Sequence, residues 1–184
     1  MELGTYTAAT HAVQREVRAI LEILAGSRID DRHIGIDGCS VPTFALPLAA
    51  LARAFAVLGT EHGLAPERAA ACRRLRAACA AKPWHVAGTG VFATELMSHF
   101  GPRVFVKGGA EGVYCGLVPE QGLGIAIKCA DGAGRAAEVM MATILMRLIG
   151  EDPLLAKYAR PAVRNWRGMV VGEIRPTAAA KPVR

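Results

Sequence analysis

A lysine that could take part in proton transfer, Lys128, is the last but one residue of the strand-like stretch "LGIAIKC" (residues 123–129). Successive side chains of a strand point to opposite faces, so one face would carry the apolar residues and the other Gly124, Ala126 and Lys128. A lysine that burial keeps neutral can remove the proton of a serine hydroxyl and so activate a nucleophile. Two interpretations stay open: such a base beneath a closely packed element, or an edge-strand lysine that points to solvent.

The hydroxyl and thiol side chains give this lysine no obvious partner. None of Ser27, Ser40 and Ser98 is followed three residues later by lysine, so the chain has no SxxK pair. The five cysteines are an odd set without CxxC spacing, which argues against both a disulfide framework and a zinc ribbon. A lone cysteine is normally a small buried apolar residue, so reduced thiols with mainly structural roles are expected.

The hydrophobic periodicity predicts the elements that position these residues. Helical spacing is found at residues 10–26, 46–59, 66–81, 88–101 and 135–150. Short β-branched runs predict strands at 103–107, 112–118, 123–129 and 167–176, with a turn at "PEQG". This order indicates an α/β fold, an α+β sandwich in which helices pack on an antiparallel sheet. Residues 27–42 are expected to form a loop or a short strand, and the tail 177–184 to be disordered.

Composition excludes several other classes of protein. A chain of 184 residues suits one domain, and no apolar run approaches the roughly 18 residues of a membrane span. The N-terminus lacks the regions of a signal peptide, so a cytoplasmic protein that contacts no membrane is expected. The net charge of +6 is concentrated in "ERAAACRRLRAACAAK" without interleaved aromatic residues, which favours a solvated helix face over a nucleic-acid site. "GTG" at 88–90 lacks the third glycine of a dinucleotide-binding loop.

Three longer stretches carry a family resemblance. They are "GIDGCSVPTFALPL" (35–48), "VAGTGVFATELM" (86–97) and "KGGAEGVYCGLVPEQGLGIAIKCADGAGRA" (107–136). In order and approximate spacing they resemble the asparaginase II family, typified by rhizobial L-asparaginases. The resemblance implies the fold of serine β-lactamases and penicillin-binding proteins. It also implies hydrolysis of L-asparagine to L-aspartate and ammonia by a serine that a lysine activates, with a zinc ion near the site.

The resemblance assigns roles to four residues. Lys128 matches the strand lysine that faces the catalytic serine, which implies a general base or proton shuttle. Cys39 in "DGCS" matches one of the zinc-ligating cysteines, and Asp37 is the accompanying acid that orients the site. Cys115, on the strand that precedes Lys128, is expected either near the substrate pocket or in the core.

The chain also departs from the family pattern. Family members carry the SxxK nucleophile and a "CSGKH" stretch in an N-terminal half, and neither motif occurs here. Residues 1–176 are therefore expected to be the C-terminal half of an asparaginase-like domain, inactive alone and with weak or absent zinc binding. It would need a separate N-terminal half or form a homodimer. The missing half is expected to cover the glycine and alanine face beside Lys128. The alternative is a non-catalytic structural or interaction module.

Overall fold

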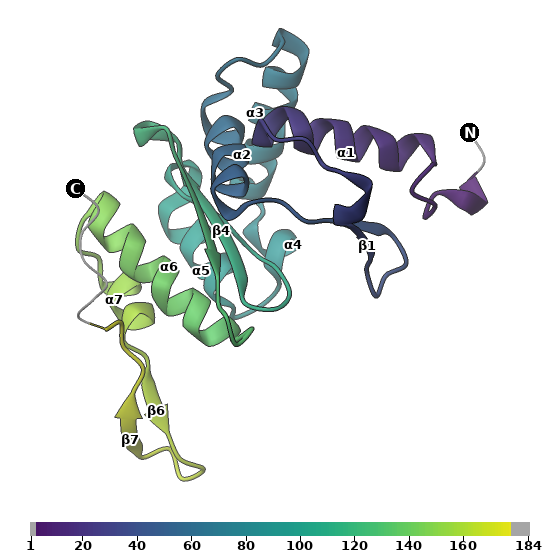
Figure 1. The fold of residues 1–184 in the computed structure, drawn as a ribbon. Coiled ribbons are helices and arrows are strands. Elements are labelled where there is room, and N and C mark those ends of the chain that lie inside the picture. The colour runs from purple at the N-terminus through teal and green to yellow at the C-terminus, as the bar shows by residue number, and fades with distance from the viewer. Residues whose placement is uncertain (1–2, 178–184) are drawn as a thin grey trace.

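A three-stranded antiparallel sheet with helices on both faces forms the centre of the molecule (Figure 1). The computed structural model describes residues 3–177. The α-helices are α1 (Ala12–Ala25), α2 (Leu48–Thr60), α3 (Pro66–Ala81), α4 (Pro83–Ala87), α5 (Phe92–Phe100), α6 (Gly134–Ile149) and α7 (Pro153–Ala159). The strands are β1 (Ile34–Ile36), β2 (Pro42–Phe44), β3 (Phe105–Gly108), β4 (Val113–Val118), β5 (Leu123–Lys128), β6 (Ala162–Arg164) and β7 (Val170–Glu173). The fold is thus mixed helix and sheet, as the sequence predicts.

The central sheet has the strand order β3-β4-β5, and both pairs of strands are antiparallel. Ile125 and Ile127 are buried, whereas Lys128 is exposed on the opposite face. The predicted alternation is therefore confirmed. Leu123 is an exception on the apolar face, since it is 40% exposed beside the turn that joins β4 to β5.

One face of the sheet packs against α5 and α6, and α7 packs in turn on these two helices. Gly116 allows this close packing, because a Cβ atom there would lie 3.2 Å from the sulfur of Met141 on α6. The main core is built from the buried residues of these elements: Phe92, Ala93, Leu96, Met97, Phe100, Val104, Val106, Tyr114, Val118, Ile125, Ile127, Cys129, Ala137, Met141, Ala142, Leu145, Leu155 and Ala159. The apolar stripe of α6 therefore faces the sheet.

The opposite face of the sheet lies under α2. A Cβ atom at Gly124 would be only 1.9 Å from the carbonyl oxygen of Ala52, so the backbones of β5 and α2 are in direct contact. The rings of Phe55 and Phe105 stack beside this contact at 6.2 Å. The expectation that a missing half covers the glycine and alanine face is therefore wrong at Gly124, where a helix of this chain packs.

Several short elements were not predicted from the periodicity. Pro83 begins α4 and Pro153 begins α7, whose first turn is capped by the Asp152 carboxylate through a 2.8 Å bond from the N–H of Leu154. β1 lies within residues 27–42, where a loop or a short strand is expected, and it forms a hairpin with β2, which runs on to Phe44. Helices of 5 and 7 residues are too short to give a clear 3.6-residue period.

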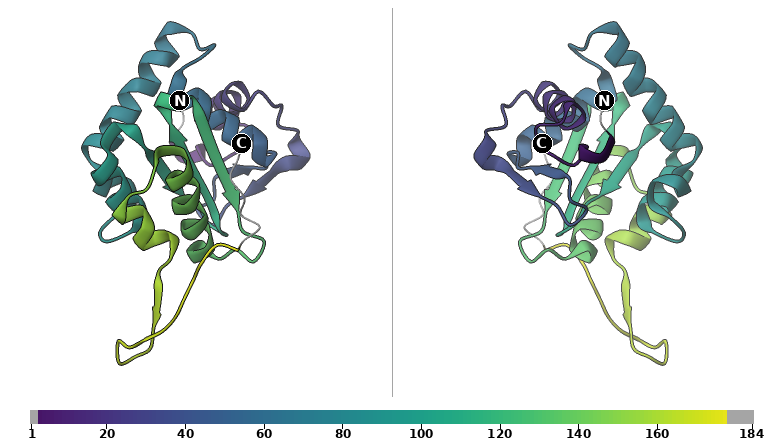
Figure 2. Two further views of the ribbon diagram at one scale, coloured as in Figure 1. Left: turned by 90° about the vertical axis from the view of Figure 1, so that its left-hand side faces the viewer. Right: turned by 90° about the vertical axis from the view of Figure 1, so that its right-hand side faces the viewer.

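The last predicted strand differs from the structure in its pairing. It is shortened to β7, which pairs with β6 in a separate hairpin that projects away from the body of the molecule (Figures 1 and 2). The side chains of both strands are exposed. Of the predicted disordered tail, 177–184, only Thr177 belongs to the described residues.

The contact at Gly124 gives a stability prediction. Gly124→Val should lower the free energy of unfolding by roughly 3 kcal/mol, because the added side chain would collide with the backbone of α2. Denaturant unfolding followed by circular dichroism would measure this change.

Gly134→Ala is the matched control, because a Cβ atom at Gly134 meets open space and should change the unfolding free energy by no more than about 0.5 kcal/mol. Equal stabilities of the two variants would contradict the close packing of α2 on β5.

Candidate functional site

Lys128 lies at the end of β5, over the turn that joins β3 to β4. Its amine donates hydrogen bonds to the backbone carbonyl oxygens of Glu111 at 2.5 Å and Cys129 at 2.7 Å. Glu111 has a left-handed backbone with φ of 60°, which is uncommon for a residue other than glycine. The unusual turn therefore presents a carbonyl group to the lysine.

A second lysine, Lys107, lies on the same face of the sheet. Lys107 on β3 pairs with Cys115 on β4, which pairs with Ala126 on β5. Lys128 lies two residues after Ala126, so its side chain is on the same face of the sheet. The amine of Lys107 donates to the carbonyl oxygen of Gly108 at 2.6 Å. The strand alternation in "RVFVK" could have indicated this residue, because it places Lys107 on one face with Phe105.

Cys115, which pairs with Lys107 in the register, is buried and only 4% exposed. Burial raises the pKa of its thiol to about 11, although the nearby charge of Lys107 acts in the opposite direction. The thiol is therefore protonated at neutral pH. This supports the expectation of a core residue more than that of a reactive group in a substrate pocket.

Asp37 and Cys39 meet in the loop between β1 and β2. One carboxylate oxygen of Asp37 accepts a bond of 2.7 Å from the N–H of Gly38, and the other accepts a bond of 3.6 Å from the Cys39 thiol. Ser40 closes the loop by donating its N–H to the Asp37 carbonyl oxygen at 2.8 Å. Ser40 also has φ of 70°, so this exposed loop holds a left-handed serine beside a thiol and a carboxylate.

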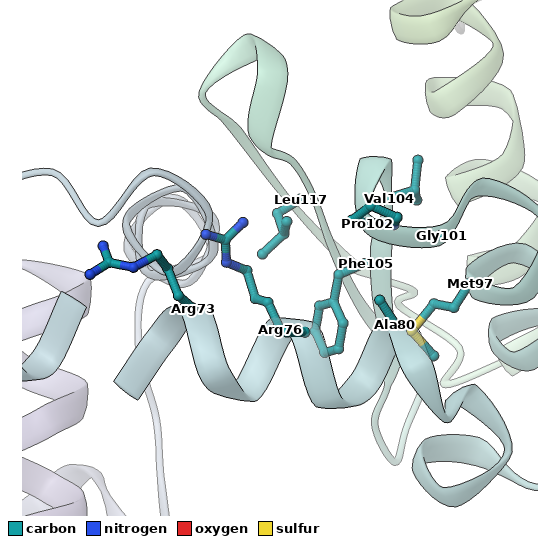
Figure 3. A pocket seen from close by; sticks show the side chains of 10 residues that line it. Arg73, Arg76, Ala80, Met97, Gly101, Pro102, Val104, Phe105 and Leu117 are labelled. Carbon is teal, nitrogen blue, oxygen red and sulfur yellow. The ribbon is translucent and has the colours of Figure 1, made fainter. Parts of the chain in front are cut away.

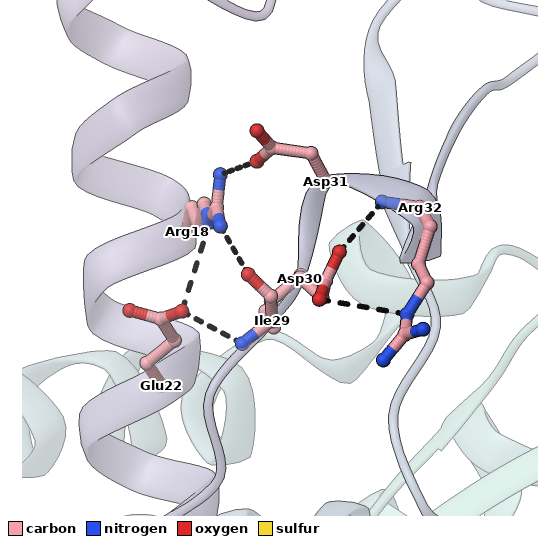
Figure 4. A network of polar contacts seen from close by, with 6 residues as sticks. All are labelled: Arg18, Glu22, Ile29, Asp30, Asp31 and Arg32. Carbon is pink, nitrogen blue, oxygen red and sulfur yellow. Dashed lines mark hydrogen bonds and ion pairs between the residues drawn. The ribbon is translucent and has the colours of Figure 1, made fainter.

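Ion pairs from α1 hold the segment that leads into this hairpin (Figure 4). Arg18 bonds the carbonyl oxygen of Ile29 and pairs with the Asp31 carboxylate at 2.7 Å. Glu22 accepts the N–H of Ile29 at 2.7 Å. Because Ile29 is itself buried, these contacts fix the base of the hairpin that carries Asp37.

The predicted site residues thus fall into two groups. Asp37 and Cys39 share one loop, and Lys128 and Cys115 share one face of the central sheet. Figure 1 shows the β1–β2 hairpin to one side of the central sheet.

The helix α2 relates the two groups. A Cβ atom at Gly122 would face Thr60, near the end of α2, whereas one at Gly124 would face Ala52, so α2 runs antiparallel to β5. Its first turn therefore lies toward the Lys128 end of the strand, and β2 leads into that turn after three residues. Both groups consequently flank the start of α2.

The hydrogen bonds of Lys128 within residues 3–177 end on backbone carbonyl groups, so none joins it to a serine hydroxyl. Of the three serines, Ser40 and Ser98 are exposed and Ser27 is half-buried. A serine–lysine pair is accordingly not assembled by the described part of the chain.

The zinc site implied by the resemblance can be compared with the donors present. No group of three or more histidine, cysteine, aspartate or glutamate residues is placed to hold a metal ion within residues 3–177. Asp37 and Cys39 supply two donors, whereas zinc sites use three or four protein ligands. These residues do not by themselves fit a complete zinc site.

Two further observations bear on the partners of the protein. No helix within the described residues combines the length and hydropathy required to cross a membrane. Arg68 and Arg73 of the basic helix α3 form ion pairs with Glu16 and Glu61, respectively. Part of its charge is therefore neutralised within the chain.

Comparison with known proteins gives one family. The family model described as L-asparaginase II matches residues 1–176 of the 184-residue chain. No curated protein matches the chain. The family match covers both groups of candidate residues.

The different surroundings of the cysteines predict different reactivities. Iodoacetamide at about pH 8 should label the exposed Cys39 at least roughly 100-fold faster than Cys115, because the Cys115 thiol is buried and protonated. Mass spectrometry of the digested protein over a time course would give both rates.

Labelling in guanidinium chloride is the control, since unfolding should bring the two rates close together. Fast labelling of Cys115 in the folded protein would contradict its place in the core.

Proposed function

The chain belongs to the L-asparaginase II family, and we propose that it supplies the general base of an amidohydrolase that converts L-asparagine to L-aspartate and ammonia. Asparaginase-like function in general follows from the family. The position of Lys128 gives the most direct support for its role as the base. It is the last residue of β5 and lies on the face of the central sheet that α2 covers.

The proposed reaction has two steps with balanced proton transfers. A serine hydroxyl attacks the side-chain amide carbonyl while the amine of Lys128 takes the hydroxyl proton. The proton then passes to the amide nitrogen, the carbon–nitrogen bond breaks, and ammonia leaves an ester on the serine. Water attacks this ester with the lysine again as base, which releases L-aspartate and restores the hydroxyl.

We propose that the nucleophile comes from a further part of the asparaginase fold, either in the same polypeptide or in a separate one. A base must lie within about 2.6–3.2 Å of the hydroxyl that it deprotonates. The amine of Lys128 instead donates to the carbonyl oxygens of Glu111, at 2.5 Å, and Cys129, at 2.7 Å. It is exposed, so another segment can approach it.

The β6–β7 hairpin supports the existence of such a segment. Trp166 at its tip is fully exposed, and Val170 and Val171 are more than half exposed. An isolated two-stranded hairpin is at best marginally stable in water, and exposed apolar surface of this kind is typical of an interaction site. We propose that the N-terminal half of the family fold, or a second copy of the chain, packs against it.

We propose that this chain provides only part of the family's zinc site and only part of its fold. Cys39, with Asp37 beside it, would provide one side of a zinc site whose remaining ligands come from the other part of the fold, so this chain alone should bind zinc weakly or not at all. Helices on both faces of an antiparallel sheet are compatible with part of a β-lactamase-like fold. L-asparagine is the proposed substrate.

A non-catalytic structural or interaction module is the alternative. It is favoured by Cys115, which is protonated and in the core, and by the absence of a bond between Lys128 and any serine within the described residues. Such a module would keep the sheet and α2 but use the hairpins for binding alone.

Ammonia release from L-asparagine should separate these functions. The purified 184-residue chain alone should show no turnover above background, and addition of an N-terminal half that carries SxxK should restore it. Lys128→Ala should then lower kcat by roughly 100-fold or more, because the base is lost.

Lys82→Ala is the matched control, since Lys82 is an exposed lysine between α3 and α4 and should leave kcat unchanged. Turnover by the chain alone that Lys128→Ala and Ser40→Ala both abolish would show that the nucleophile lies in this chain. Restored turnover that survives Lys128→Ala would refute the role of the base, and no turnover in any mixture would favour the interaction module.

A further inference from the structure

The β6–β7 hairpin carries strand edges that the chain itself does not cover. It projects away from the body of the molecule (Figures 1 and 2), and the side chains of both strands are exposed. Within residues 3–177 each of the two strands pairs only with the other, so the outer edge of each strand has no partner. Two isolated strands are at best marginally stable in water, whereas three or more support one another. The hairpin would therefore gain stability from further strands.

The two outer edges of the hairpin differ in how well they are protected. β6 follows directly after Pro161, which has no N–H group to donate, and it ends at Arg164. Proline and basic side chains are features by which natural edge strands avoid pairing with another chain. β7 begins with Val170 and Val171, and it contains neither proline nor a basic residue. β7 therefore presents the edge to which another strand can add.

The exposed area of the chain is large enough for two different partners. The accessible surface is 11462 Å², whereas a monomeric protein of this mass is expected to expose roughly 8,500 Å². The excess is several times the roughly 800 Å² that one partner contributes to a standard interface. The other part of the asparaginase fold has to reach Lys128 at the central sheet. The hairpin, which projects away from the body, is left for a second copy of the chain (Figure 1).

Charge disfavours docking of the hairpin onto the body of this second copy. The pocket between α3, β3 and β4, about 150 Å³ in volume and largely apolar, could receive an aromatic ring (Figure 3). Arg73 and Arg76 line one end of the pocket, and Arg167 directly follows Trp166 at the tip of the hairpin. Insertion of Trp166 would bring these like charges together, which is unfavourable. A contact between the two hairpins avoids this repulsion.

We propose that β7 pairs edge to edge with β7 of a second copy, so that the two hairpins form one four-stranded antiparallel sheet. A twofold axis makes the two β7 strands antiparallel and brings the tip of each hairpin to the base of the other. Trp166 of one copy then lies near Ile174 of the other and is removed from water. Arg167 approaches Glu173 of the other copy, and these opposite charges attract each other. The pairing involves no group of the candidate site, so it is independent of amide hydrolysis.

The test is analytical ultracentrifugation of the 184-residue protein combined with amide hydrogen exchange. The protein should sediment as a dimer, and N–H groups on the outer edge of β7 should exchange at least 10-fold more slowly in the dimer than in the diluted monomer. A protein that stays monomeric, or a dimer whose β7 edge exchanges as fast as in the monomer, would overturn the proposal. Protection of this edge only after addition of the N-terminal half would assign it to that half instead.

Variants of the two strands test the contact independently. Val171→Lys should raise the dimer dissociation constant at least 10-fold, because lysine on an edge strand opposes pairing. Val163→Lys on β6 is the matched control and should change the constant less than 2-fold. Both valines are exposed, at 62% and 39% respectively, so neither substitution disturbs the core. Equal dissociation constants for the two variants would refute pairing through β7.

Trp166 reports on the same contact. In a Trp84→Phe background, which removes the second tryptophan of the chain, Trp166 fluorescence should shift to shorter wavelength as the dimer forms, because the indole leaves water. Val171→Lys should abolish this shift. A dimer whose Trp166 emission equals that of the monomer would contradict the antiparallel arrangement.

Discussion

The direct contact of α2 with β5 at Gly124 is the constraint on which the rest of the structure depends. The carbonyl oxygen of Ala52 occupies the space of a Cβ atom, so the helix and strand approach more closely than side chains allow. This contact fixes which face of β5 is covered by α2 and leaves Ile125 and Ile127 to face α6. The same alternation then places Lys128 beyond the covered part of the strand.

The sequence predicted those parts of the fold whose pattern repeats over enough residues. Alternation over six residues identified β5 and the face of Lys128, and helical spacing identified α6. It also indicated that some element lies close to Gly124. It could not identify α2 as that element, because the pairing joins residues about seventy positions apart and depends on how the intervening helices pack. The short α4 and α7 depend on proline and a single Asp152 cap.

The candidate site was predictable to a similar extent. The contact between Asp37 and Cys39 is local, so two-residue spacing was enough to place them together. The burial of Cys115 and its row with Lys107 depend on the β3–β4 register, which the motif alone does not fix. The carbonyl partners of Lys128 depend on a left-handed Glu111, a conformation that glutamate rarely adopts.

The strand alternation left two interpretations of Lys128 open: a base beneath a closely packed element, or an edge-strand lysine that points to solvent. Its carbonyl partners bear on this choice. β5 is an edge strand of the described sheet, and a lysine that protects such an edge acts through a solvated charge at the end of a mobile side chain. Lys128 instead folds back onto Glu111 and Cys129, so its amine is held at a defined point beside the turn. A base must lie within hydrogen-bond reach of the hydroxyl that it deprotonates once the substrate is bound. Of the two interpretations, the exposure of Lys128 on an edge strand matches the second, while its two carbonyl partners define the point at which a nucleophile would have to approach the amine.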